Sequence, residues 1–176
     1  MDSPSDPVGD TVSAPVVLTR PTGHNQGLAC LLSPRDIPVL EWPGGVIEPL
    51  EHTAPERADV VVFASPNAVR HCEPFPQAVV IAQGPGTARS LQERGISVHH
   101  IADPPRSSGV VGAVLKCAEP PATIVIVGGD LRGSSATQVL REHGFTVCTL
   151  TVYRNVAPSS MAYSRVPLTA VVYASP

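Results

Sequence analysis

Short polar turns follow several apolar runs of this sequence, and they are the residues best suited to chemistry. The runs at 16–18, 60–63 and 124–127 are rich in valine and isoleucine. Such runs predict buried parallel strands, and ligands bind where the carboxyl ends of such strands meet. A helix that begins at such an end offers free N–H groups, which favour an anion without any lysine. The turns are Thr19-Arg20, Ser65-Pro66-Asn67, Gly84-Pro85-Gly86-Thr87, Gly128-Gly129-Asp130 and Ser175.

The polar side chains of these turns also have a purely structural explanation. Ser65, Asn67, Thr87 and Ser134 stand where helices are expected to begin, and Ser, Thr and Asn are ordinary helix caps. Gly86-Thr87 is the best single candidate for binding, because glycine lets a ligand approach the backbone closely.

Tyr153 and three arginines are the remaining candidates. Tyr153 ends a long expected strand and is either a half-buried sheet tyrosine or a group that hydrogen-bonds a ligand. Arg20, Arg132 and Arg154 either bind carboxylates through two parallel hydrogen bonds or lie solvated on the surface.

Composition excludes several classes of protein. The chain has 176 residues, 43% of them hydrophobic and 15% charged, with a net charge of −3. It contains no apolar stretch that could span a bilayer, no secretory signal, and no basic excess that would capture nucleic acid. The phosphate-binding and nucleophile-elbow motifs G-x-G-x-x-G, G-x-x-x-x-G-K-[ST] and G-x-S-x-G are absent.

The cysteines and histidines predict no metal site. Cys30, Cys72, Cys117 and Cys148 form no C-x-x-C pair, and no histidine joins them at a zinc-site spacing. His71 and Cys72 are adjacent, but a single pair is not a site. We therefore expect reduced thiols in a cytosolic protein without a metal.

Strand, turn and helix alternate along the chain, which predicts an α/β fold with a parallel sheet. Residues 1–14 are expected to be a disordered leader. The expected strands are 16–19, 37–40, 46–50, 59–63, 78–82, 96–101, 124–127 and 145–153. The expected helices are 26–32, 68–72, 88–94, 108–117 and 134–143.

One internal repeat predicts two related lobes. Residues 59–66 and 169–176 share Val, Val, Ala, Ser and Pro, with Phe63 corresponding to Tyr173. In the first copy the Ala-Ser-Pro turn leads into a helix and further strands, whereas the second copy ends at the turn. Since a buried strand needs a covering helix, we expect one lobe to be incomplete.

Several of these motifs, taken in order, resemble the uroporphyrinogen-III synthase family over about Pro15 to Pro176. They are Val17–Pro21, Asp59–Val69, Gly84–Ala88, Leu140–Gly144, Val152–Arg154 and Ala174–Pro176. The resemblance implies two flavodoxin-like or Rossmann-like lobes joined by a two-strand linker. Residues 15–45 and 155–176 would form an incomplete lobe one, residues 50–150 lobe two, and residues 46–49 and 151–154 the linker strands.

The resemblance also implies a reaction. The family cyclises hydroxymethylbilane to uroporphyrinogen III, inverting ring D and losing water, in the biosynthesis of tetrapyrroles such as haem, sirohaem and cobalamin. It implies no metal or organic cofactor, a cytoplasmic location, a monomer that contacts other enzymes of the pathway, and no nucleic-acid or membrane partner. Tyr153 matches the family's cleft tyrosine and would either hydrogen-bond the departing hydroxyl or donate a proton to it. The residues expected to bind substrate are Thr19, Arg20, Ser65, Asn67, Gly86, Thr87, Gly129 and Ser175.

Two other functions remain open on the sequence alone. The chain could be a non-catalytic two-lobed α/β module that binds a small anionic ligand or a partner protein. It could also be a flavodoxin-like nucleotide-binding domain, which tight binding of FMN or a nucleotide would indicate.

Overall fold

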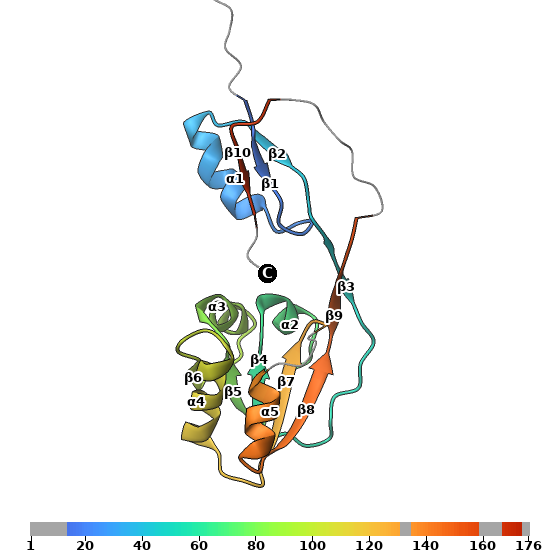
Figure 1. Cartoon of the computed structure of the whole chain (residues 1–176), viewed down its shortest axis with the longest axis vertical. Helices are drawn as coiled ribbons and strands as arrows, with labels where there is room; N and C mark the ends of the chain where they lie inside the picture. Colours follow the sequence, from blue (N-terminus) through green and yellow to red (C-terminus); the bar gives the residue numbers. More distant parts are fainter. Residues whose placement is uncertain (1–13, 131–134, 159–166, 174–176) are drawn as a thin grey trace, which may run out of the picture. The chain divides into compact units, whose positions relative to one another are not determined.

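The chain folds into two compact units, and in sequence one unit lies between the two segments that form the other (Figure 1). The computed structural model describes residues 14–130, 135–158 and 167–173. Unit 1 consists of Met1–Val46 and Val156–Pro176, and unit 2 is Ile47–Asn155. The expected leader falls almost wholly outside the described residues, as does Ser134.

Unit 2 is built on a five-stranded parallel sheet with the strand order β6-β5-β4-β7-β8. Its strands are β4 (Val60–Phe63), β5 (Val79–Ala82), β6 (His100–Ile101), β7 (Thr123–Gly128) and β8 (Thr146–Thr151). The apolar run at 60–63 is the central strand, fully buried, as a parallel strand covered on both faces must be. The expected α/β fold with parallel sheets is confirmed.

Helices α2 (Pro66–Arg70), α3 (Pro85–Glu93), α4 (Ser107–Cys117) and α5 (Ser135–Glu142) connect these strands. Gly95 and Gly144 follow α3 and α5 with φ values of +71° and +87°, the left-handed conformation that commonly ends a helix. The start of α3 differs from the expectation. Gly84 caps the helix and Pro85 opens it, so Gly86 and Thr87 lie in its first turn rather than in a preceding turn.

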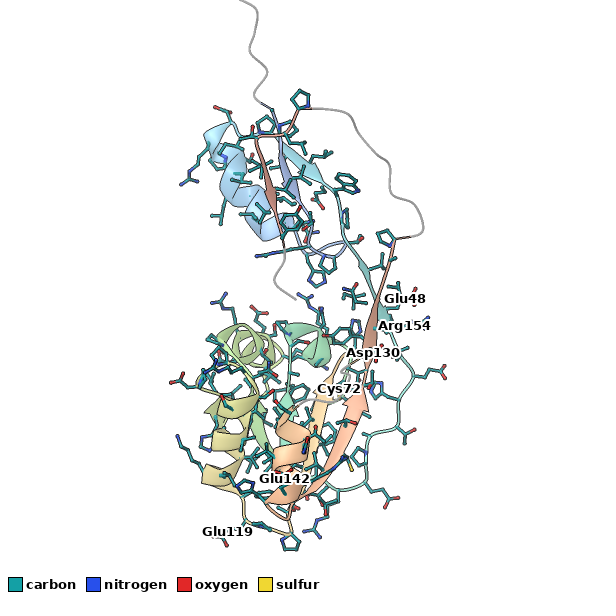
Figure 2. All side chains as sticks on the ribbon, viewed as in Figure 1. Glu48, Cys72, Glu119, Asp130, Glu142 and Arg154 are labelled. Carbon is teal, nitrogen blue, oxygen red and sulfur yellow. The ribbon has the colours of Figure 1, made fainter. Side chains whose placement is uncertain are left out.

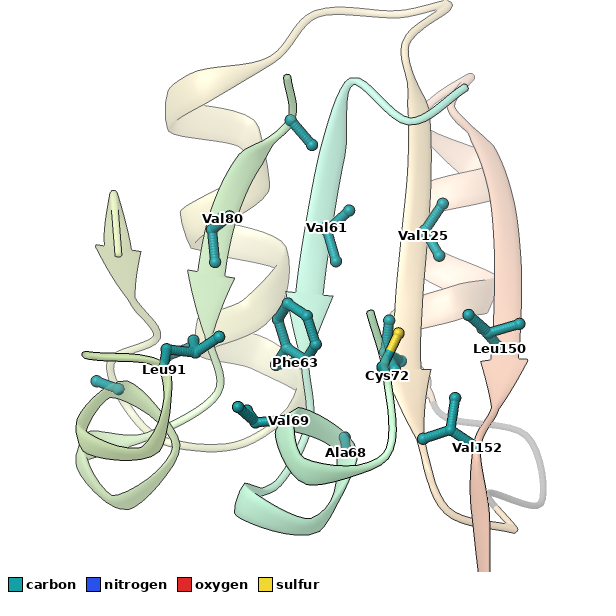
Figure 3. Packing of buried hydrophobic residues seen from close by; sticks show 14 residues of the cluster. Val61, Phe63, Ala68, Val69, Cys72, Val80, Leu91, Val125, Leu150 and Val152 are labelled. Atoms are coloured by element: carbon teal, nitrogen blue, oxygen red, sulfur yellow. The ribbon is translucent and has the colours of Figure 1, made fainter. Parts of the chain in front are cut away.

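The sheet of unit 2 has a separate apolar core on each face, because successive strand residues point to opposite sides. Val61 and Phe63 pack with Val69 of α2 and Leu91 of α3 on one face (Figure 3). The other face is covered by α4 and α5 and contains Val60, Val62, Ile81, Val110, Val114, Ile124 and Leu140. Helices therefore cover both faces of the sheet, α2 and α3 on one and α4 and α5 on the other.

Arg94 joins two helices on the first face. Its guanidinium donates hydrogen bonds to the carbonyl oxygens of Val69 and Cys72, at 2.9 Å for Cys72. These carbonyls lie at the end of α2, where backbone acceptors have no partner within the helix. Arg94 therefore links the end of α3 to the end of α2, the helix that Ser65 begins.

Unit 1 contains a three-stranded parallel sheet with the order β10-β1-β2. The strands are β1 (Val16–Leu18), β2 (Val39–Glu41) and β10 (Ala170–Val172), and α1 (Gln26–Leu32) with the 3-10 turn η1 (Ser33–Arg35) connects β1 to β2. β1 is the buried middle strand. Its register pairs Val16 with Ala170 and Leu18 with Val172, so the two ends of the chain meet in one sheet.

Strands β3 (Val46–Pro49) and β9 (Tyr153–Val156) pair in a third, two-stranded sheet. Arg154 and Glu48 form an ion pair of 2.9 Å across it (Figure 2). The single strand expected at 145–153 is therefore wrong: it divides into β8 and β9 at Val152, whose N–H donates to Gly128 O while its carbonyl accepts from Leu50 N. The strand expected at 96–101 is also wrong in length, because only His100–Ile101 pairs with β5.

Candidate active site

The carboxyl ends of β4, β5, β7 and β8 lie along one edge of the unit 2 sheet, because all its strands are parallel. Three expected site residues come within two positions of the ends of these strands and therefore lie at this edge. Ser65 comes two residues after β4, Gly129 directly follows β7, and Tyr153 comes two residues after β8. The structure brings these three residues together.

The hydroxyls of Ser65 and Tyr153 are hydrogen-bonded at 2.9 Å, although the residues are 88 positions apart. Ser65 is also the N-cap of α2, since its Oγ accepts the N–H of Ala68 at 3.1 Å. The structural explanation for Ser65 as a cap is thus confirmed. The same oxygen also contacts the tyrosine hydroxyl, so Ser65 links the start of α2 to the first residue of β9.

Gly129 lies against the ring of Tyr153. A Cβ at this position would stand 2.7 Å from Cε2 and Cζ of Tyr153 and 3.1 Å from its hydroxyl oxygen. Gly129 is buried and Tyr153 is partly buried beside the first apolar core. The ring therefore contacts this glycine and the first apolar core, and its hydroxyl is hydrogen-bonded to Ser65.

His71 is a neighbour of Tyr153 that sequence reasoning set aside. The two ring centroids are 6.3 Å apart and the rings are tilted by 44°. His71 follows the last residue of α2, the helix that begins after Ser65. Its position one short helix beyond an expected site serine was the signal that could have identified it.

Gly86 and Thr87 belong to the first turn of α3, next to α2. A Cβ on Gly86 would meet Cγ of Pro66 at 4.0 Å, an ordinary contact distance. The expectation that Thr87 caps a helix is wrong, because Gly84 is the N-cap of α3 and Thr87 lies within the helix, where it is only 4% exposed. What this turn offers a ligand is its backbone, since the first N–H groups of a helix lack partners within the helix. Asn67 lies in α2, and its Oδ1 accepts from Arg70 at 3.2 Å.

Thr19 and Arg20 lie in unit 1, at the carboxyl end of β1. The Thr19 hydroxyl donates to Val172 O at 2.9 Å, which anchors β10 beside β1. The carbonyl of Arg20 accepts from Nδ2 of Asn25, a fully buried residue whose Oδ1 has no hydrogen-bond partner among the described residues. Ser175 lies outside the described residues.

A cavity of about 340 Å³ lies at the amino end of β4, the end opposite Ser65. The carboxylate of Asp59, which lines this cavity, accepts from Thr123 N at 2.8 Å and from Arg57 at 3.2 Å. The backbone hydrogen bond from Thr123, together with Arg57, lowers the pKa of Asp59 below its usual value. These contacts join the starts of β4 and β7, which gives the Asp59 carboxylate a structural role.

The four cysteines are free thiols that differ in exposure. Burial raises the pKa of the Cys72 thiol to about 11, although nearby Arg94 acts in the opposite direction. Burial also raises the pKa of Cys117, which is half-buried, whereas Cys30 and Cys148 are exposed. Within the part of the chain that the structure describes, no three His, Cys, Asp or Glu side chains gather in a way that could hold a metal ion.

We expect thiol reactivity at pH 8 to follow this order. Cys30 and Cys148 should react rapidly with Ellman's reagent, Cys117 slowly, and Cys72 only after denaturation, since about one Cys72 in a thousand would be a thiolate at that pH. Mass spectrometry of the modified peptides identifies each site. Rapid modification of Cys72 in the native protein would contradict its burial beneath α2.

Open parallel sheets with small polar turns at their carboxyl edge are typical of ligand-binding α/β proteins. A family model described as "Uroporphyrinogen-III synthase HemD" matches residues 26–176. The chain therefore belongs to the uroporphyrinogen-III synthase family.

Solved structures with the same fold include two bacterial enzymes. A mutant uroporphyrinogen III synthase from Thermus thermophilus is 18% identical with a TM-score of 0.58, and the match covers 82% of this chain and 64% of that one. The uroporphyrinogen-III synthetase of Helicobacter pylori is also 18% identical, with a TM-score of 0.52 and coverage of 84% and 64%. This chain thus spans somewhat less than two thirds of their length. No curated protein matches it significantly.

No helix among the described residues is both long enough and apolar enough to cross a membrane.

Proposed function

We propose that this protein is a uroporphyrinogen-III synthase, a cofactor-independent lyase that cyclises hydroxymethylbilane to uroporphyrinogen III with inversion of ring D. The observation that carries the proposal is the Tyr153 hydroxyl held at 2.9 Å from Ser65 on the carboxyl edge of the sheet. Membership of the family supports hydroxymethylbilane as the substrate, and this substrate has a leaving hydroxyl that Tyr153 could protonate. In this proposal the enzyme acts as a cytoplasmic monomer in tetrapyrrole biosynthesis.

The reaction requires a hydroxyl group to leave a flexible polycarboxylate. Tyr153 donates its proton to that hydroxyl, and the carbon–oxygen bond breaks. Water departs and leaves an azafulvene-like cation. The substituted α carbon of ring D attacks this cation and forms a spiro intermediate, whose bond to the methylene group of ring C then breaks. The unsubstituted α carbon of ring D attacks the cation formed on ring C, and the proton lost from that carbon restores the phenol. Proton donation by a positioned side chain contributes on the order of 10²–10⁴-fold to such a step.

Holding the substrate is the second task. Closure at the substituted carbon competes with simple closure, so the orientation of the chain ends decides which isomer forms. The backbone N–H groups at Gly86 and Thr87 bind carboxylates, because helix N-termini favour anions. The sequence also predicts Thr19, Arg20, Ser65, Asn67, Gly129 and Ser175 as substrate-binding residues. Arg20 is exposed, and its guanidinium forms a charge-assisted hydrogen bond with a propionate or acetate group.

A coupled assay tests the proposal on the wild-type chain. Hydroxymethylbilane is generated in situ, the products are oxidised, and isomers III and I are separated by chromatography. An excess of isomer III that depends on the protein and grows with its concentration is the expected result. Isomer I alone, from a chain shown by circular dichroism to be folded, would exclude the activity for this chain. FMN and nucleotide titrations of the same sample test the binding-domain alternative.

A further inference from the structure

Ser65 has one hydroxyl proton and two oxygen lone pairs, and the structure accounts for most of that capacity. One lone pair accepts the Ala68 N–H at 3.1 Å, which is the capping hydrogen bond of α2. The hydrogen bond of 2.9 Å to Tyr153 takes either the proton or the other lone pair. Ser65 is thus already engaged on both sides, so little of its hydroxyl is left for direct contact with a substrate.

The direction of the Ser65–Tyr153 hydrogen bond matters for chemistry. If Ser65 donates to the phenol oxygen, the phenol proton points elsewhere and can be given to a leaving group. The same serine proton then remains bonded to the phenolate that results, and a hydrogen bond to a charged form stabilises it. The capping hydrogen bond uses a lone pair of the serine oxygen and leaves its proton available for the phenol oxygen.

Gly129 determines where the phenol ring can lie. Its missing side chain leaves the space in which Cε2 and Cζ of Tyr153 stand, both 2.7 Å from the position a Cβ would take. The ring also packs against the first apolar core, so a Cβ at residue 129 would displace it from a packed position. A methyl group at residue 129 would therefore push the phenol away from Ser65.

We propose that Ser65 and Gly129 are positioning residues that act through Tyr153, rather than residues that bind the substrate. Gly129 leaves the space that the ring of Tyr153 occupies. Ser65 donates a hydrogen bond to the phenol oxygen, so the phenol proton is free to be donated to the substrate. The contacts of the phenol with Ser65 and Gly129 are observed, the direction of its hydrogen bond is proposed, and the effect on catalysis rests on the proposed function. The two parts can be tested separately.

Raman spectroscopy of a single-tyrosine chain tests the orientation. Tyr163→Phe and Tyr173→Phe leave Tyr153 as the only tyrosine of the three. The intensity ratio of its Fermi doublet reports whether the phenol oxygen accepts or donates a hydrogen bond. We expect Ser65→Ala and Gly129→Ala to shift the ratio toward that of a solvated phenol. Gly112→Ala is the matched control, because a Cβ at Gly112 meets nothing within 4 Å, and it should leave the ratio unchanged.

A further variant separates orientation from capping. Ser65→Asp keeps a good N-cap for α2 but has no proton to donate at neutral pH, so the stability should hold while the Raman ratio changes. Ser65→Thr retains both functions and should restore the wild-type ratio. A ratio that is the same in the wild type, Ser65→Ala and Gly129→Ala would overturn the proposal.

Kinetics test the catalytic part. Loss of one orienting hydrogen bond should lower kcat for isomer III about tenfold in Ser65→Ala, with KM almost unchanged and recovery in Ser65→Thr. A raised KM at unchanged kcat would instead make Ser65 a substrate-binding residue and contradict the proposal. If the wild-type chain forms no isomer III, the proposed function fails, and the Raman comparison still decides whether Ser65 and Gly129 position the phenol.

Discussion

Replacing Tyr153 by phenylalanine is expected to reduce the rate of isomer III formation by on the order of 10²-fold or more. Phenylalanine keeps the ring against Gly129 and the first apolar core, and removes only the hydroxyl that contacts Ser65 at 2.9 Å. The protein should therefore fold normally and lose about 1 kcal/mol of unfolding free energy, the typical net contribution of one hydrogen bond. The coupled assay and a urea titration of the same sample measure both quantities.

The matched control for this prediction is Tyr173→Phe. Tyr173 is 79% exposed and follows β10 in unit 1, so removal of its hydroxyl should change neither the rate nor the stability. Residual spontaneous closure gives isomer I, and the ratio of isomers therefore separates catalysis from background. A Tyr153→Phe chain with wild-type kcat would mean that another group supplies the proton.

Adding a methyl group at Gly109 is expected to be the most destabilising small change in unit 2. Gly109 is buried in α4, and a Cβ there would lie 2.0 Å from Pro104 O and 2.7 Å from the carbonyl carbon of Asp103. Both are backbone atoms, which cannot rotate away as a side chain can. Gly109→Ala should cost about 3 kcal/mol, the upper part of the usual range for overpacking.

Gly112→Ala in the same helix supplies the comparison. No atom lies within 4 Å of a Cβ at Gly112, so alanine should gain up to about 1 kcal/mol from its higher helix propensity. Urea denaturation of both variants measures the difference. Equal stabilities would show that the approach of residues 103–104 to α4 is not required for folding.

Much of the fold could be predicted from the sequence, because its strands are short and continuously apolar. The run at 60–63 has no polar residue and is the buried centre of the sheet. The start of α3 could not be located, since Gly84-Pro85-Gly86 has the composition of a turn. Proline is nevertheless well suited to the first position of a helix, where its missing N–H costs nothing.

The length of β6 depends on a side chain that imitates the backbone. Nδ1 of His99 accepts the N–H of Val80 at 3.0 Å, while the N–H of His99 donates to Val80 O at 2.9 Å. The ring takes the place of a carbonyl, so the ladder begins only at His100. No propensity or periodicity indicates such a substitution.

The candidate site was predictable in its residues and not in its contacts. Ser65 and Tyr153 could each be selected by their position after an apolar run. Their hydrogen bond depends on the strand order β4-β7-β8 and on the break at Val152 that directs β9 away from the sheet. The role of Gly129 was equally hidden, because a glycine that makes room for a ring resembles any other turn glycine in sequence.

The pairing of β1 with β10 has a consequence for the order in which the protein assembles. Thr19 and Val172, joined by a hydrogen bond, are 153 residues apart in the chain. During synthesis every strand of unit 2 has been made before β10, so unit 2 can fold while β1 still lacks its second neighbour, β10. Once folded, unit 2 holds Leu50 N and Val152 O at 2.9 Å, which removes most of the loop that must close. We therefore expect damage to the core of unit 2 to slow the pairing of β1 with β10 as well, because the intervening loop would then be longer.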